Sequence, residues 1–178
     1  MLLLAGLVFA RHQSFNGAVL LRSEAYEVAL SIREVQFAAV SAESAGDPDG
    51  DGVSDFRSVE GVYFTTDDDD AYKIFRDLDD DKSYDSNEQY GKQGTIDNRF
   101  EIRAMRGVGA SVGSNVAIVF ERPNFDARFF DENGNEIQAS RIEIDIAKRG
   151  DTGTGGEVVR TVEVTATGQI SVQKLATE

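Results

Sequence analysis

The first 41 residues carry the pattern of one long helix. Residues 1–10 contain no charged side chain. Further along, apolar residues recur at alternating steps of four and three: Leu21, Ala25, Val28, Ile32, Val35 and Ala39. This spacing keeps one helix face apolar, opposite a polar face that includes Arg22, Glu27 and Glu34. We predict a helix over residues 1–41 whose second half packs on a sheet.

Such a helix is longer than the domain that follows it requires. At about 1.5 Å per residue it extends roughly 60 Å, more than a small domain needs to cover its core. In residues 1–10 the apolar side chains are distributed all round the predicted helix. That distribution indicates burial on every side, by lipid or by other helices.

After the helix, apolar and polar residues alternate, as in strands that bury one face. Ile142, Ile144 and Ile146 on one face alternate with Glu143 and Asp145 on the other. We predict strands at residues 59–65, 71–75, 99–105, 115–121, 125–130, 137–147, 158–165 and 169–174.

The turns between these strands are typical of antiparallel hairpins. Asn133 and Gly134, between the fifth and sixth predicted strands, both tolerate positive φ. The predicted class is therefore α+β, with a long N-terminal helix packed on an antiparallel β-sheet or β-sandwich. We divide the chain into a helical part, residues 1–45, and a β-rich globular part, residues 46–178.

Composition and charge exclude several function classes. Asp and Glu number 32 against 18 Lys and Arg, a net charge of −14, so we expect no nucleic-acid partner. The chain has no cysteine, which excludes disulfides and thiolate chemistry. Its single histidine, His12, lies in the predicted helix, and no nucleophile or phosphate-binding motif occurs. We expect no catalytic residues and no enzyme.

An acidic loop directly after the helix has the spacing of a calcium site. Its candidate ligands fall at loop positions 1, 3, 5, 7 and 9: Asp47, Asp49, Asp51, the Val53 carbonyl and Asp55. Gly52 stands at position 6, where the loop turns sharply. Position 12 is Ser58, so a bidentate ligand must come from elsewhere, such as Glu60. This loop, residues 47–58, resembles those of thrombospondin type 3 repeats and dockerins.

A second acidic loop, residues 77–88, has the complete spacing. Positions 1, 3, 5, 7, 9 and 12 are Asp77, Asp79, Asp81, Ser83, Asp85 and Glu88. Lys82 replaces the usual glycine at position 6, so we expect a strained turn with the positive charge pointing outward. We predict that the two loops hold one or two Ca²⁺ ions; the alternative for each is a solvated acidic turn.

The helix and parts of the β-region together resemble a known family. Residues 14–36, SFNGAVLLRSEAYEVALSIREVQ, follow an apolar segment and precede a β-rich domain. With residues 61–64 and 164–172, they are similar to type IV pilin-like proteins, closest to the H-class minor pseudopilins and the minor pilins of type IV pili. The resemblance implies a subunit held in the inner membrane by its helix, with an extracytoplasmic domain, that packs with other subunits into a pilus or a type II secretion filament.

The beginning of the chain departs from that family. Its members start with a short basic leader, a glycine at the cleavage site and a Phe-Thr-Leu-Ile-Glu-type segment, none of which is present. We expect Met1 to be an internal or trimmed start that lacks about a dozen residues of the roughly 20 that cross a membrane. Membrane insertion and N-terminal methylation are therefore assigned to no residue here.

Two functions follow as hypotheses. The first is a structural filament subunit with a calcium-stabilised β-domain. The second is a secreted calcium-binding β-sandwich that acts as an adhesion or binding module, with residues 1–10 as a signal peptide. A long helix continuous with an apolar N-terminus favours the filament subunit, because a secreted module does not need one.

Overall fold

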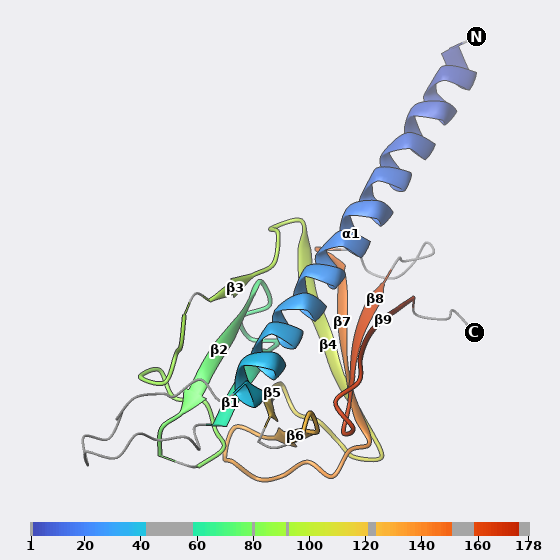
Figure 1. Cartoon of the computed structure of the whole chain (residues 1–178). Coiled ribbons are helices and arrows are strands. Elements are labelled where there is room, and N and C mark those ends of the chain that lie inside the picture. The colour runs from blue at the N-terminus through green and yellow to red at the C-terminus, as the bar shows by residue number, and fades with distance from the viewer. Residues whose placement is uncertain are drawn as a thin grey trace.

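The protein consists of one long helix and two antiparallel β-sheets. The computed structural model describes residues 2–41, 59–79, 81–91, 93–120, 124–150 and 159–174, with helix side chains from residue 17 onward. Helix α1 (Leu2–Val40) is followed by nine described strands (Figure 1). The predicted α+β class, with the helix first and antiparallel sheets after it, is confirmed.

The first sheet has five strands and the second has four. The first runs in the order β3 (Gly94–Thr95), β2 (Ala71–Asp77), β1 (Val59–Thr65), β5 (Asn115–Phe120) and β6 (Ala127–Phe130). The second runs in the order β4 (Phe100–Val108), β7 (Arg141–Lys148), β8 (Arg160–Thr165) and β9 (Ile170–Lys174). Every pair of neighbours is antiparallel.

The second half of α1 closes the core between the two sheets. It lies against β1 and β5 of the first sheet and against β7, β8 and β9 of the second (Figure 1). All six apolar positions of the predicted stripe are buried, in one cluster with residues of both sheets: Leu21, Ala25, Val28, Ile32, Val35 and Ala39. The prediction that this face packs on a sheet is confirmed.

Polar contacts fix the helix along the second sheet and the β6 edge. An Arg33 guanidinium N–H donates to the Ile170 carbonyl over 2.7 Å. The Gln36 side-chain amide donates to the carbonyls of Phe125 and Gly168, both at 2.8 Å. These bonds join α1 to two backbone segments, at residue 125 and at residues 168–170, so its rotation about its own axis is fixed as well as its position.

The first half of α1 extends beyond both sheets. In Figure 1 it projects away from the β-domain, with the N-terminus at its far end. Among the described residues, no helix combines the length and the apolar character that crossing a membrane requires.

The prediction that each strand buries only one face is wrong for β5. All five residues from 116 to 120 are buried. Val116, Ile118 and Phe120 belong to the main core, while Ala117 and Val119 face a second cluster. That cluster contains Phe75 and Phe130, with Tyr63 and Tyr84 packed against it. The loop after β2 places Tyr84 against this second cluster, on the side of the first sheet away from the main core. Both sides of β5 are therefore covered.

The predicted hairpin turn at Asn133 and Gly134 is present, but the pairing that follows it is short. Gly134 has φ of 73°, and its amide donates to the Asp131 carbonyl over 3.2 Å. After the turn, Phe130 forms an antiparallel bridge with Glu136, and the Ile137 amide donates to the Phe129 carbonyl over 2.8 Å. The chain then crosses to the second sheet, where β7 begins at residue 141 instead of 137. The two-residue strand β3 was not predicted, since two residues carry no alternation.

Candidate functional site

Three carboxylates meet where β2 ends. Asp77 is the last residue of β2, and Asp79 and Asp81 follow it in the loop. One oxygen from each of them lies within 4.8 Å of the others. Asp77 is buried and the other two are exposed, so the cluster has one side in the protein and one side in solvent. These are positions 1, 3 and 5 of the predicted calcium loop.

The Asp77 carboxylate is only half satisfied. Its side chain is 0% exposed. One oxygen, Oδ2, accepts hydrogen bonds from the Lys82 backbone amide at 3.1 Å and from the Lys82 ammonium at 3.3 Å. The other oxygen, Oδ1, is buried and has no hydrogen-bond partner among the described residues. A buried acceptor without a donor is costly, so Asp77 retains an unused acceptor beside the cluster.

Lys82 is strained as predicted, but its charge does not point outward. Its φ of 64° is the only positive value at a non-glycine position in the described parts of the chain. The ammonium turns inward to Asp77, and the side chain is 16% exposed. The expectation of an outward charge is wrong because a buried carboxylate attracts the nearest cation more strongly than solvent does.

The remaining predicted ligands lie outside the three-carboxylate cluster. Glu88 is 3% exposed, and its two oxygens accept backbone hydrogen bonds from Leu78 at 2.7 Å and Asp85 at 3.0 Å. Burial raises the pKa of Glu88 above its ordinary value, and the negative charge of Asp77 adds to that effect. Glu88 therefore holds the loop in its folded shape.

Ser83 also holds the loop in place. Its backbone amide donates to Asp81 Oδ1 over 2.7 Å. Its hydroxyl donates to the Glu132 carbonyl over 3.0 Å. A side chain at Gly134 would collide with the Asp81 carbonyl oxygen, so the two loops are in close contact there. The glycine that ends the 131–134 turn thus lets that turn support the acidic loop.

Aromatic packing fixes the other side of the acidic loop. The Tyr84 ring stacks on Tyr63 with the centroids 5.1 Å apart, and it meets the edge of Phe75 at 5.8 Å. The carboxylates are thus carried by a loop that is attached to the sheet and to a neighbouring turn. Such a site is partly formed before any ion binds, which lowers the entropic cost of binding.

The first predicted loop lies outside the described residues. It spans residues 47–58, with Asp47, Asp49, Asp51, Val53 and Asp55 as its candidate ligands. Glu60, the proposed source of a bidentate ligand, is described: it is buried and pairs with Arg76 at 2.9 Å. The ligand set of this loop remains a prediction.

The donor set of the second loop fits a hard divalent cation. Calcium prefers carboxylate and carbonyl oxygens in flexible arrangements of six to eight ligands. Asp77, Asp79 and Asp81 would supply three of these oxygens, and the exposed side of the cluster leaves room for water. Within the described residues, neither this loop nor its neighbours place a nucleophile beside a base.

A second candidate surface lies on the outward face of α1. Its large apolar side chains are exposed: Val19 by 52%, Tyr26 by 48%, Leu30 by 56% and Phe37 by 68%. At 3.6 residues per turn, these four positions fall within about 20° of one line along the helix. We call them the outer seam. They lie opposite the buried stripe, so α1 has two apolar faces.

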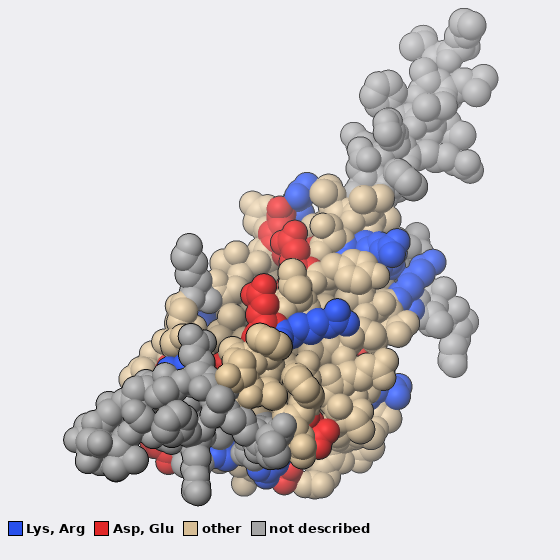
Figure 2. Space-filling view, viewed as in Figure 1, with Lys and Arg blue, Asp and Glu red and all other residues tan. Residues whose placement is uncertain are grey.

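Charged residues flank the outer seam with opposite signs on its two sides. Helical geometry places Arg22 and Arg33 on one side and Glu27 and Glu34 on the other. Figure 2 has this face in front and shows acidic groups along one side of the helix and basic groups along the other. The arrangement resembles an apolar seam between charged flanking positions in a coiled coil.

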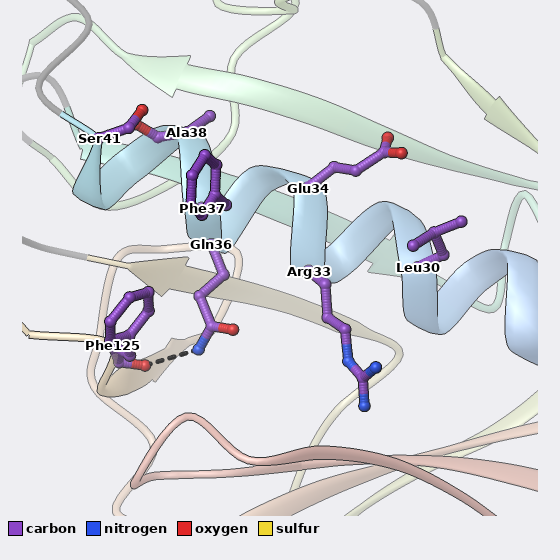
Figure 3. Close-up of a pocket in the computed structure, with 8 residues that line it drawn as sticks. All are labelled: Leu30, Arg33, Glu34, Gln36, Phe37, Ala38, Ser41 and Phe125. Atoms are coloured by element: carbon purple, nitrogen blue, oxygen red, sulfur yellow. Dashed lines mark hydrogen bonds between the residues drawn. The ribbon is translucent and has the colours of Figure 1, made fainter.

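At its C-terminal end the outer seam borders an open groove. Figure 3 shows Leu30 and Phe37 on α1, and Phe125 across from them on the chain that precedes β6. Gln36 points down between helix and sheet to the Phe125 carbonyl. This surface was not predicted, because the outward face was judged by its charges alone. The spacing of seven, four and seven at residues 19, 26, 30 and 37 was already present in the sequence.

Comparisons with protein-family models, with curated proteins and with solved structures give no match for this chain.

Proposed function

We propose that this chain is a structural subunit of a helical filament, of the kind formed by minor pilins and pseudopilins in type IV pili and type II secretion systems. The single observation that carries the proposal is the second apolar face of α1. The buried stripe of α1 already packs against the two sheets, so the outer seam is available to contact another molecule. The N-terminal half of α1, which extends past the β-domain, offers a further surface for packing against other helices.

The proposed mechanism is assembly through helix packing. The outer seam of one subunit packs on the helix of a neighbouring copy, and the projecting half of α1 packs among others in the filament core. Burial of a Leu or Phe side chain contributes about 1.5–3 kcal/mol, so four seam residues give a substantial driving force. The basic flank of one helix then faces the acidic flank of the next, which sets their relative register.

In this proposal the acidic β-domains face the medium outside the cytoplasm. Before assembly, the helix holds the subunit at the inner membrane. A chain with a net charge of −14 repels its neighbours at close approach, and divalent cations in the acidic loops would reduce that repulsion. Extracellular calcium sites bind at about 10⁻⁴ to 10⁻³ M, so such loops fill only outside the cytoplasm.

The proposal is tested by polar substitution in the outer seam. Phe37→Asp and Leu30→Asp change side chains that are 68% and 56% exposed, so the fold should remain intact. The full chain is expressed in its native cells, and its incorporation into sheared filaments is compared with that of the unchanged protein. Tyr90→Asp, at a side chain 46% exposed and away from the helix, is the matched control.

Loss of incorporation for the two seam variants, with Tyr90→Asp unaffected, is the expected result. Equal incorporation of all three variants would contradict the assembly role. Recovery of the protein in the medium as a soluble species, with no filament fraction, would instead support a secreted calcium-binding module.

A further inference from the structure

We propose that Lys82 is a built-in counter-ion of the second acidic loop, and that a divalent cation binds there by replacing the Lys82 ammonium at Asp77. The inference deepens the cation-binding part of the proposed function and does not depend on filament assembly. It concerns the relation between one lysine and one buried carboxylate, which the loop spacing does not reveal.

The first support is the position of the two charges. The Lys82 ammonium lies 3.3 Å from Asp77 Oδ2, and the Lys82 backbone amide lies 3.1 Å from the same oxygen. Asp77 is the one fully buried member of the three-carboxylate cluster. A cation that contacts all three carboxylates must therefore come close to the ammonium, and the two positive charges repel each other.

The second support is the unsatisfied oxygen. Asp77 Oδ1 is buried in a side chain that is 0% exposed, and it has no donor among the described residues. Lys82 thus neutralises the charge of Asp77 without satisfying both of its acceptors. A divalent cation with several coordination positions can contact the Asp77 carboxylate together with those of Asp79 and Asp81, whereas a single ammonium offers only three N–H donors.

The third support is the backbone at Lys82. A φ of 64° is unfavourable for a lysine, so the surrounding structure must compensate for it. The amide bond to Asp77 Oδ2 and the ammonium pair on the same oxygen provide that compensation. When the ammonium leaves, the amide bond still holds the turn, so the loop keeps its shape during the exchange.

The exchange requires little movement elsewhere. Glu88 fixes the loop through the amides of Leu78 and Asp85, and Tyr84 is packed on Tyr63 and Phe75. The flexible Lys82 side chain can swing into solvent without disturbing these contacts. The loop consequently alternates between a lysine-neutralised form and a cation-bound form on the same backbone, and the lysine lowers the cation affinity.

The experiment measures Ca²⁺ and Tb³⁺ binding by the full chain and four variants. Tyr84 lies in the loop, so Tb³⁺ luminescence excited through tyrosine reports occupancy, and Ca²⁺ competition gives its affinity. Lys82→Gln removes the counter-ion, and Lys82→Gly also relieves the positive φ. Asp79→Asn removes an exposed ligand without risk to the core. Lys73→Gln, which breaks the Lys73–Asp68 pair at 3.1 Å, changes the net charge equally and is the control.

We expect Lys82→Gln to bind Ca²⁺ about tenfold more tightly than the unchanged protein, and Lys82→Gly at least as tightly. Lys73→Gln should leave the affinity within about twofold, since Lys73 pairs with Asp68, which is 47% exposed and lies outside the loop. Asp79→Asn should lower the affinity about tenfold or more. Acetylation of Lys82, read by mass spectrometry, should become faster when Ca²⁺ is added.

Two results would overturn the inference in different ways. If Lys82→Gln and Lys73→Gln change the affinity equally, Lys82 acts only through net charge and the exchange is wrong. If neither the unchanged protein nor Lys82→Gly binds either ion, the loop is no cation site, and the cation-binding part of the proposed function fails with it. The outer-seam test of filament incorporation is a separate measurement, and neither result decides it.

Discussion

The two faces of α1 carry apolar side chains in different surroundings. The inner stripe consists of Leu, Ala, Val and Ile residues that are at most 4% exposed, and both sheets cover it. The outer seam carries larger side chains, among them Phe37 and Leu30, and nothing in the described chain covers them. A helix that served only the β-domain would be polar on its outer face. The inner face therefore supports folding, and we propose that the outer face supports association with other copies of the chain.

The largest expected effect is on the inner face. Ile32→Ala removes a side chain that is 0% exposed in the centre of the core, and should lower the free energy of unfolding by about 2–5 kcal/mol. Leu30→Ala, two residues away but 56% exposed, should change it by less than about 0.5 kcal/mol. Urea denaturation of both variants measures the contrast. Equal losses would mean that the outer seam also supports the fold.

A smaller loss of folding stability is expected at Gln36, a polar residue on the inner face of α1. Gln36→Leu keeps the size of a side chain that is 8% exposed but removes the donor from two carbonyls, those of Phe125 and Gly168. Unsatisfied buried carbonyls should lower stability by about 1–3 kcal/mol. Glu34→Ala, an exposed position two residues earlier, is the control in the same denaturation experiment. A stable Gln36→Leu variant would show that apolar packing alone fixes the helix.

Near the N-terminal end of the inner face, Glu24 should make the stability of the protein depend on pH. Glu24 accepts the Asp97 amide over 3.0 Å, and burial raises its pKa above 4.5. A raised pKa means that the folded state binds the proton more tightly, so the Glu24 contribution improves as pH falls from neutral through that raised value. Glu24→Gln keeps the acceptor without the charge. Its thermal stability should exceed that of the unchanged protein at pH 7, and the difference should shrink towards pH 4.5.

The pKa of the neighbouring Asp97 is shifted in the opposite direction, below its ordinary value. Its bonds to Arg99 lower the pKa of Asp97 to about 2, so it stabilises the fold above its ordinary pKa of 3.8 and loses that effect as pH falls to about 2. Stability below pH 4 should therefore fall in both proteins of the Glu24 experiment. A difference between them that grows on acidification, instead of shrinking, would contradict the burial effect on Glu24.

The smallest expected effect concerns the charged flanks of the outer seam. Glu27→Lys places a positive charge on the acidic side and should weaken self-association, with the larger loss at low salt, because exposed pairs contribute about 0.2–1 kcal/mol. Combining Glu27→Lys with Arg22→Glu reverses the charge on both sides of the seam at this part of the helix. The double variant should regain part of the association. Sedimentation of the full chain at two salt concentrations measures both. Unchanged association in the single variant would show that the flanks do not set the register.

The sequence predicted the helix well and the sheets only in part. The inner stripe of α1 was recognisable because its six apolar positions recur with a period near 3.6, which is typical of a helix packed on one side. β1 was predicted with its observed bounds, residues 59–65. β5 was given one buried face, because the burial of Ala117 and Val119 depends on a loop that carries Tyr84 from more than thirty residues away in the chain. Local alternation does not contain such information.

The candidate cation site shows the same limit. Loop spacing placed Asp77, Asp79, Asp81 and Glu88 in one predicted ligand set, and the structure brings the three aspartates together. Both Glu88 oxygens accept hydrogen bonds from backbone amides of the same loop, which the spacing did not predict. The structure also turns Lys82 towards the carboxylates, which a rule for position 6 does not predict. The spacing of residues in the loop identifies candidate ligands by residue type. Which groups each side chain contacts depends on how deeply it is buried.

A second acidic run, in the turn between β1 and β2, provides a comparison. Residues 67–70 are four consecutive aspartates at the other end of β2. There Asp68 pairs with Lys73, and Asp69 pairs with Arg149 at 2.9 Å. No aspartate of this run has a buried oxygen without a partner. The run therefore has the higher density of charge, while the loop at Asp77 has the unsatisfied carboxylate that a cation requires.

The central claim, that the outer seam joins copies of this chain, is tested most directly by cysteine cross-linking. The chain contains no cysteine, so Leu30→Cys and Phe37→Cys introduce single thiols on the seam, and Tyr90→Cys introduces one elsewhere on the surface. Mild oxidation is applied to the full-length protein in its native cells. We expect disulfide-linked dimers from the seam positions and almost none from Tyr90→Cys. Monomers at both seam positions, or equal dimer formation at all three, would contradict the claim.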